Sequence, residues 1–192
     1  SVIETAEQQM LSDSVFSVMF SDTILLYTQG DTKRDLEAIL IASGEILQKA
    51  MFNNVPVRIG VAHGLFFVNS KESMYAGPAL IEAYDIGEAA QWLGIVVSET
   101  IWQRSVKEGC KSGQSNVVIA ADIPTKLGLR PGYAMNWPAT YRHDLKVLPP
   151  IPVELFYSQF EHALGPFCNL NAHERAKYVN TTDFLNLCLE RV

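Results

Sequence analysis

Few residues of this chain have the type and spacing that chemistry requires, and the first candidate is a single carboxylate. The stretch "FSDTILLY" (20–27) places Asp22 between two apolar runs that are typical of β-strands. A Ser-Asp pair is unusual at a tight hairpin, where Asn-Gly or Asp-Gly is preferred. Because Asp readily hydrogen-bonds its own backbone, the residues alone favour a turn-forming role for Asp22 over a role in a site.

The other reactive side chains lack the spacing of a metal or disulfide site. The three cysteines are odd in number, widely separated and outside any CxxC pattern, which argues against a disulfide framework or a zinc site and indicates a reducing cytoplasm. The four histidines show no metal-ligand spacing, so we expect structural or surface roles. For Arg58, within a predicted strand, a substrate contact, an interface contact and an intramolecular ion pair all stay open. The cysteines and histidines are Cys110, Cys168, Cys188, His63, His143, His162 and His173.

The composition limits the class of protein. The chain has 192 residues, enough for one domain with a substantial core, and we expect residues 1–192 to form a single domain. Its longest apolar runs fall short of the ~18 residues that a bilayer span needs, so we predict a soluble protein with no membrane segment. The net charge of −6 argues against binding nucleic acid through its phosphates but leaves a small anionic ligand with a metal open. No secretory signal is visible, and because the first residue is Ser, we expect the natural start to lie upstream.

The elements around Asp22 follow from hydrophobic periodicity. Residues 14–20 and 23–28 are expected to pair as an antiparallel hairpin with Asp22 at its tip. An amphipathic helix is predicted over 32–52, followed by a buried strand over 55–64. The next residues, "LFFVN", either pair with that strand or continue into a loop.

A second helix is predicted to begin at Gly77-Pro78 and to end at Gly94, which is expected to act as its C-cap. Glu82 and Glu88 are most simply the polar face of this helix. A short strand is expected over 95–98, with Ser98 capping a third helix.

Beyond residue 107 the pattern weakens. Recurring Gly, Ser, Pro and Lys predict an irregular excursion over 107–150, in which only "NVVIAAD" and "YAMNW" suggest strands. Residues 151–160 are predicted to form a strand that completes the sheet, and a helical tail is expected from about 170. This order of elements predicts an α/β fold of the α+β sandwich type, with a mixed, largely antiparallel sheet and packed helices. The tail residues expected on one side of its helix are Tyr178, Phe184, Leu185 and Cys188.

Three stretches together resemble the catalytic domain of class III nucleotidyl cyclases: "FSDTILLY", "VRIGVAHG" (57–64) and "YAGPALIEAYDIGEAAQWLGIVVSETIW" (75–102). The likeness is closer to short, stand-alone bacterial cyclase-like proteins, including pyrimidine cyclases of antiphage defence, in which "FSD" and "GPAL-x-x-AY" recur. It covers about residues 12–105 and the tail helix. The resemblance implies a ferredoxin-like cyclase fold, a homodimer, Mg²⁺ or Mn²⁺, and conversion of a nucleoside triphosphate to a 3′,5′-cyclic nucleotide and pyrophosphate.

The same resemblance assigns roles to residues. Asp22 becomes a catalytic metal ligand, since Mg²⁺ prefers oxygen ligands and a hairpin tip presents a carboxylate at a fixed distance. Ser21 beside it is expected to contact substrate. The base-reading positions fall on Val18 and Met74, both apolar, so adenine readout is not supported and a pyrimidine triphosphate is the preferred substrate. Lys146, in a stretch similar to the family's "LKG…PVEVY", is a candidate phosphate ligand, with a solvated surface lysine as the alternative.

The chain also departs from the family pattern. The second metal-binding Asp belongs to a strand that would lie ahead of Ser1, one strand and a crossover helix upstream. The position of the family's transition-state Asn falls on Ile81 and that of its Arg on Asp85, and neither can donate to a developing phosphate charge. Two other functions therefore stay open. One is a catalytically silent cyclase-homology domain that binds a nucleotide or a protein partner, and the other is an α/β interaction domain whose motif matches are accidental.

Overall fold

The computed structural model describes residues 14–141 and 150–190, so Lys146 and His143 lie outside the described residues. The chain divides into two compact units between Ile46 and Leu47, and each unit is described by itself. That the whole chain forms a single domain stays a prediction.

The first unit contains the predicted hairpin. Strands β1 (Val15–Phe20) and β2 (Thr23–Thr28) pair antiparallel over their full length, which confirms the pairing predicted from the two apolar runs. Helix α2 (Lys33–Phe52) follows, as its periodicity predicts. The helix begins where Thr32 and Asp35 cap each other: the Thr32 N–H donates to Asp35 Oδ2 at 2.9 Å, and the Asp35 N–H donates to Thr32 Oγ1 at 3.3 Å.

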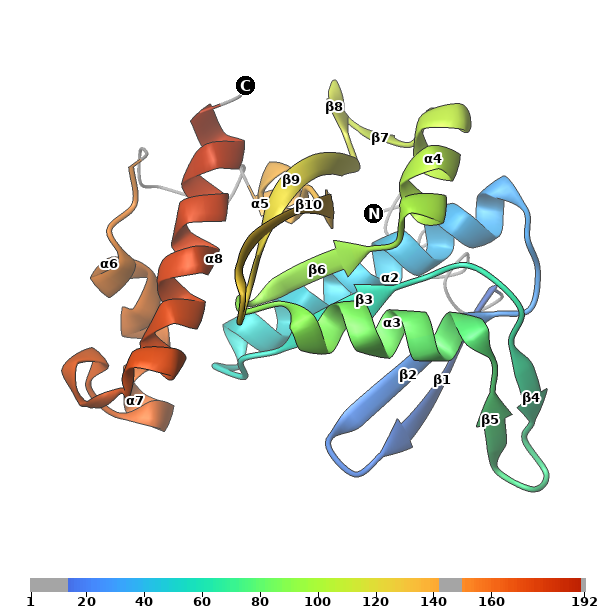
Figure 1. The fold of residues 1–192 in the computed structure, drawn as a ribbon, viewed down its shortest axis with the longest axis horizontal. Coiled ribbons are helices and arrows are strands. Elements are labelled where there is room, and N and C mark those ends of the chain that lie inside the picture. Colours follow the sequence, from blue (N-terminus) through green and yellow to red (C-terminus); the bar gives the residue numbers. More distant parts are fainter. Residues whose placement is uncertain (1–13, 142–149, 191–192) are drawn as a thin grey trace, which may run out of the picture. The chain divides into compact units, whose positions relative to one another are not determined.

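The second unit is built on a four-stranded sheet with the order β3-β6-β10-β9 (Figure 1). Strands β3 and β6 are parallel, and the other neighbouring pairs are antiparallel. The stretch "LFFVN" contributes β4, which pairs with β5 in a separate hairpin and not with the preceding strand. The strands are β3 (Arg58–Val61), β4 (Phe67–Asn69), β5 (Met74–Ala76), β6 (Gly94–Val97), β7 (Lys111–Ser112), β8 (Ser115–Asn116), β9 (Val118–Thr125) and β10 (Gly128–Met135).

Helix α3 (Pro78–Ala89) links β3 to β6 and lies along β3, as Figure 1 shows. Its close approach depends on two glycines: a Cβ on Gly60 would overlap the Ala83 carbonyl oxygen, and a Cβ on Gly87 would lie 3.1 Å from the Gly60 nitrogen. The predicted start at Gly77-Pro78 is confirmed, but the prediction that Gly94 is the C-cap is wrong. Ala90 already has an extended backbone, and Gly94 is the first residue of β6.

Helix α4 (Glu99–Lys107) begins as predicted, because the Ile101 N–H donates to the Ser98 side chain at 3.4 Å. The irregular excursion predicted over 107–150 is wrong for much of the described part, whereas the strands suggested by "NVVIAAD" and "YAMNW" are confirmed. Strands β9 and β10 pair over eight residues each, and helix α5 (Trp137–Tyr141) follows them.

The strand predicted over 151–160 is also wrong, because these residues form short helices, whereas the predicted helical tail is confirmed as α8 (Ala172–Glu190). Tyr178, Phe184, Leu185 and Cys188 of α8 are all buried, as expected. Side chains of α8 also bind the backbone ahead of β6: the Leu93 N–H donates to Thr181 Oγ1 at 2.7 Å, and Asn180 Nδ2 donates to the Gln91 carbonyl at 2.7 Å. The short helices are α6 (Val153–Tyr157), η1 (Ser158–Phe160), α7 (Glu161–Leu164) and η2 (Phe167–Asn169).

The predicted fold class is confirmed: helices pack against sheets in which, among the described strands, antiparallel pairs outnumber the parallel pair β3–β6, as in an α+β sandwich. The finer assignment to a ferredoxin-like cyclase fold stays a prediction. Within residues 14–141 and 150–190, no helix is both long enough and apolar enough to cross a membrane.

Candidate functional site

The tip of the β1–β2 hairpin presents Asp22 to solvent. Phe20 pairs with Thr23, so only Ser21 and Asp22 connect the strands, and both side chains are exposed. Ser21 has a φ of 52°, a left-handed conformation that costs a residue with a Cβ about 1–2 kcal/mol. Within the described residues, no hydrogen bond of the Ser21 or Asp22 side chain offsets that cost. The turn therefore holds the Asp22 carboxylate at its apex without a hydrogen bond to its own backbone. The turn-forming role would have required such a hydrogen bond.

Val18 and Met74, the two expected base-reading positions, lie in different units of the chain. Val18 is half-buried in β1 and pairs with Leu25, whereas Met74 begins β5 in the second unit and is 52% exposed. Neither side chain can form a hydrogen bond to a purine edge. Whether Val18 and Met74 contact a base at all stays a prediction.

A shallow depression of about 480 Å³ runs along the exposed side of α3. Ile81 and Asp85, one helical turn apart, both line it, so the structure brings together the two positions at which the chain departs from the cyclase pattern. The depression is lined by Gly77, Pro78, Ile81, Glu82, Asp85 and Ile86.

The electrostatics of this depression are acidic. Glu82 and Asp85 place two carboxylates in it, and α3 contains no Lys, Arg or His that could balance them. An anionic phosphate chain is repelled by such a surface, while a cationic group is attracted. Sequence reasoning treated Glu82 as part of a plain polar face, and the signal that it missed is the spacing of three between Glu82 and Asp85, which places both carboxylates on one side of the helix.

The guanidinium of Arg58 is bound to α3 and to the residue that follows it. Its Nη2 forms an ion pair with Glu88 Oε1 at 2.6 Å, and its Nη1 donates to the carbonyls of Glu88 and Ala90 at 3.1 and 3.2 Å. These carbonyls are at the C-terminal end of α3, where a cation is favourable. Of the three roles left open for Arg58, the structure shows the intramolecular ion pair.

Among the described residues, the clearly shifted pKa values belong to two tyrosines of the C-terminal helices. Burial raises the pKa of Tyr178 to about 12, assisted by the charges of Tyr157 and Glu174. Burial also raises the pKa of Tyr157, whose hydroxyl donates to the Gly165 carbonyl at 2.8 Å. Both phenols stay protonated at neutral pH, so this buried cluster is structural and does not supply a general base.

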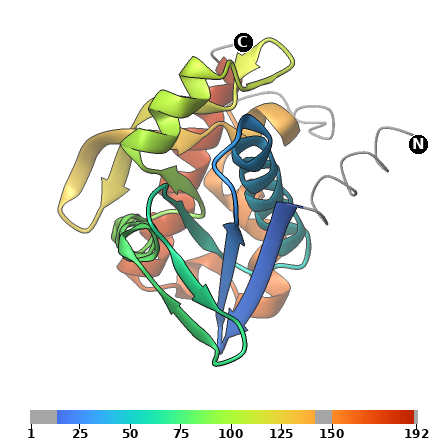
Figure 2. The same ribbon diagram turned by 90° about the vertical axis from the view of Figure 1, so that its right-hand side faces the viewer.

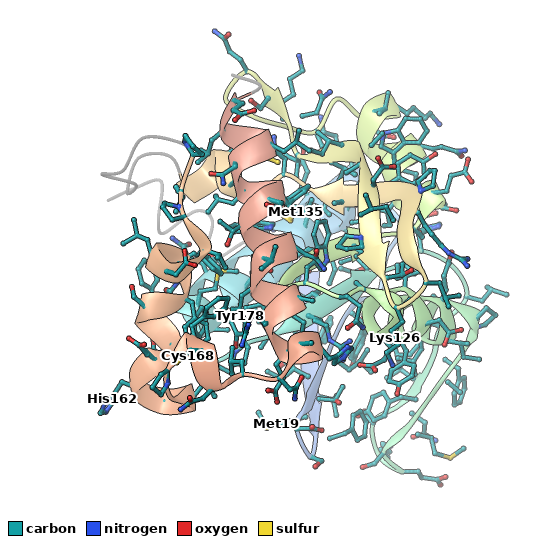
Figure 3. The ribbon with its side chains drawn as sticks, turned by 60° about the vertical axis from the view of Figure 1, so that its left-hand side comes forward. Met19, Lys126, Met135, His162, Cys168 and Tyr178 are labelled. Carbon is teal, nitrogen blue, oxygen red and sulfur yellow. The ribbon has the colours of Figure 1, made fainter. Side chains whose placement is uncertain are left out.

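His162, Cys168 and Tyr178 are labelled in Figure 3. Tyr178 lies on the side of α8 that faces the short helices, while His162 and Cys168 are exposed on those helices. In the part of the chain that the structure describes, no group of three or more His, Cys, Asp or Glu side chains could hold a metal ion by itself. A metal at Asp22 would therefore need oxygen ligands from outside the described residues, such as substrate phosphates.

Comparisons with known proteins add no assignment. The chain matches no family model, no curated protein and no solved structure.

Proposed function

We propose that this chain is a metal-dependent nucleotidyl cyclase that acts as a homodimer and converts a nucleoside triphosphate to a 3′,5′-cyclic nucleotide and pyrophosphate. The observation that supports it is the hairpin tip, where a left-handed Ser21 keeps the Asp22 carboxylate exposed and free of side-chain hydrogen bonds within the described residues. Strained backbone conformations concentrate at functional sites, and a two-residue turn on paired strands is a rigid support for a ligand.

The Asp22 carboxylate at the tip could provide one of the oxygen ligands of a Mg²⁺ or Mn²⁺ ion that also binds the substrate phosphates. Mg²⁺ is usually held by one or two carboxylates together with substrate phosphates, and the tip provides one carboxylate. The bound metal would neutralise the charge that develops when the 3′-oxygen attacks the α-phosphorus and pyrophosphate leaves. Asp22 would orient that metal, and Ser21 would contact the phosphates beside it.

A pyrimidine triphosphate is the proposed substrate, and antiphage signalling is the proposed setting, both on the resemblance to the short bacterial cyclases. The apolar Val18 and Met74 offer no polar group to an adenine edge. Each missing polar contact weakens discrimination by about 1–3 kcal/mol, so adenine selectivity should be poor.

A second candidate, a catalytically silent cyclase-homology domain, is favoured by the depression on α3. There, Ile81 and Asp85 stand where a cyclase needs hydrogen-bond donors, and Glu82 adds a further negative charge. Losing one preorganised donor typically costs a factor of about 10²–10³ in turnover. Such a domain would bind a nucleotide or a protein partner without turning it over.

The test is to incubate the protein, expressed from its complete gene, with each of the four ribonucleoside triphosphates and Mn²⁺, and to measure cyclic products by mass spectrometry. Asp22→Ala is expected to lower product formation at least 100-fold. Asp122→Ala removes another exposed carboxylate from a strand and is expected to leave it unchanged.

Each outcome decides one part of the proposal. Strong cyclic AMP formation would overturn the base assignment, and equal product from Asp22→Ala would remove Asp22 from the mechanism. If no triphosphate gives product while the protein still binds one, the silent domain is the better account.

A further inference from the structure

The turn between β9 and β10, together with the start of β10, carries two exposed leucines and two exposed cations, which we call the basic tip: Lys126, Leu127, Leu129 and Arg130. Leu127 is 80% exposed and Leu129 is 69% exposed, among the highest values of any apolar side chain described. No ion pair joins Lys126 or Arg130 to a carboxylate of the described residues. Lys126 projects at the end of this hairpin in Figure 3. Exposed apolar side chains that are grouped together and rimmed by polar residues can mark an interaction site.

The basic tip is held in one conformation. Thr125 Oγ1 donates to the Gly128 carbonyl at 2.7 Å and accepts the Leu127 N–H at 3.2 Å. Gly128 takes a φ of 99°, which glycine adopts without strain. A preformed tip loses little conformational entropy on binding, so its leucines and cations are available for docking.

The exposed side of α3 has the complementary character, and we call it the acidic face: Ile81, Glu82, Tyr84 and Asp85. Ile81 and Tyr84 are each 62% exposed, and Glu82 and Asp85 are exposed carboxylates. Within the described residues neither carboxylate has an ion-pair partner. The shallow depression described above lies on this face and includes Ile81, Glu82 and Asp85 in its lining.

We propose that the basic tip of one copy docks on the acidic face of a second copy, and that the contact is reciprocal. Lys126 and Arg130 pair with Glu82 and Asp85 of the other copy, while Leu127, at the apex of the tip, packs on Ile81. Two positive charges thus meet two negative charges, and each side also contributes an exposed apolar side chain. Charge complementarity of this kind selects the partner and fixes the register of an interface.

In a single copy, the base of the basic tip lies beside the C-terminal end of α3. Thr125, at the base of the tip, forms a β-bridge with Ala90, directly after the C-terminal end of α3. The hairpin and α3 are neighbours in Figure 2 as well. When the tip of each copy docks on the acidic face of the other, the two contacts are related by a two-fold axis and the dimer is closed.

This inference deepens the proposed function and rests on it for the idea that two copies meet at the α3 depression. It adds a chemical consequence, because the second copy brings Lys126 and Arg130 to a depression whose own lining residues include no cation. The partner's tip would neutralise the carboxylates that otherwise repel a triphosphate.

The test is a charge swap, read by size-exclusion chromatography with light scattering at micromolar concentration and without nucleotide or metal. One variant reverses the tip (Lys126→Glu with Arg130→Glu), and the second reverses the face (Glu82→Lys with Asp85→Lys). A control, Lys107→Glu with Lys111→Glu, reverses two exposed lysines elsewhere and changes the net charge as the tip variant does. Circular dichroism establishes that each variant is folded.

The wild type and the control are expected at twice the chain mass of 21.3 kDa, and each reversed variant is expected to dissociate at least tenfold more readily. Mixing the two reversed variants should restore the dimer, because both contacts of the mixed pair are again complementary. A monomeric wild type, unchanged dimers of both reversed variants, or folded variants that fail to associate on mixing would overturn the docking. A dimer without cyclic product contradicts only the cyclase proposal. Product from a monomer contradicts the docking and the homodimeric part of the proposed function, but not the cyclase activity itself.

Discussion

The two helices α3 and α8 both pack in the second unit, but they do so in opposite ways. Helix α3 approaches β3 through the Gly60–Gly87 contact and leaves a wide stripe with Ile81 and Asp85 exposed. Helix α8 is buried over most of its middle. The side-chain amide of Asn186 accepts a hydrogen bond from the Ile151 N–H at 2.7 Å and donates one to the Ile151 carbonyl at 3.0 Å.

The difference indicates that α8 mainly stabilises the fold, whereas α3 offers an exposed surface for binding. A helix held by backbone-to-backbone approach needs few side chains for packing, so the rest of its surface is available for a ligand or a partner. A helix buried on several sides must satisfy its polar groups internally, and Thr181 and Asn180 do so by binding backbone groups. We therefore expect substitutions on α8 to change mainly stability, and substitutions on the exposed stripe of α3 to change mainly function.

The largest expected effect on the free energy of unfolding is at Gly60, where β3 contacts α3. In Gly60→Ala, the new Cβ would overlap the Ala83 carbonyl oxygen, and backbone atoms cannot move aside without displacing the helix. We expect the free energy of unfolding to fall by about 3 kcal/mol or more in urea denaturation. Gly64→Ala is the control, because its Cβ would meet only Ala79 Cβ at 3.7 Å, an ordinary contact. Equal loss in both variants would show that α3 is not seated by the glycine contact.

The next effect concerns the polar anchor of α8. Thr181→Val keeps the side-chain shape but leaves the buried Leu93 N–H without its acceptor, which should lower the free energy of unfolding by about 1–3 kcal/mol. Thr182→Val is the matched control, since the one hydrogen bond of the Thr182 hydroxyl to the described residues goes to the Tyr178 carbonyl of the same helix. It should cost clearly less, and a larger loss at Thr182 than at Thr181 would contradict the anchoring role.

Sequence patterns predicted the hairpin, α2, α3 and α8 because their apolar residues repeat with the period of the element. They were incomplete for β9 and β10: residues 116–122 and 133–137 suggested strands, but Pro124, Pro131 and Gly132 kept the rest of the hairpin from being predicted. Proline and glycine are normally depleted in strands, but β9 is an edge strand, where proline is tolerated. Local composition cannot tell which strand will be at an edge.

The strand predicted over 151–160 failed for a related reason. The β-branched Ile151 and Val153 suggested a strand, although Phe156 and Phe160 are spaced for a helix and both are buried. At the candidate site, the exposed tip carboxylate could be predicted from the two flanking runs. The left-handed Ser21 and the depression on α3 could not, because both depend on three-dimensional geometry.

A smaller effect, confined to alkaline pH, is expected from Tyr178 of α8. The pKa of Tyr178 is raised from 10.0 to about 12, so the folded state holds the phenol proton more tightly than the unfolded state. This stabilisation is complete below pH 10 and is lost as the pH rises from 10 to 12. Tyr178→Phe should therefore flatten the fall of stability over that range in urea unfolding series.

The smallest effect on stability is expected at Ile81, and it is also the sharpest test of what the α3 surface does. Ile81 is 62% exposed, so Ile81→Asn should change the free energy of unfolding by less than about 0.5 kcal/mol. Leu185→Asn on α8, where the side chain is 3% exposed, should cost several kcal/mol by placing an amide in the core. The amide introduced by Ile81→Asn would supply a hydrogen-bond donor to the depression. If the chain is a cyclase limited by the missing donor, the rate of cyclic product formation in the Mn²⁺ assay should rise severalfold. If neither the wild type nor the stable variant forms product, the silent domain is favoured.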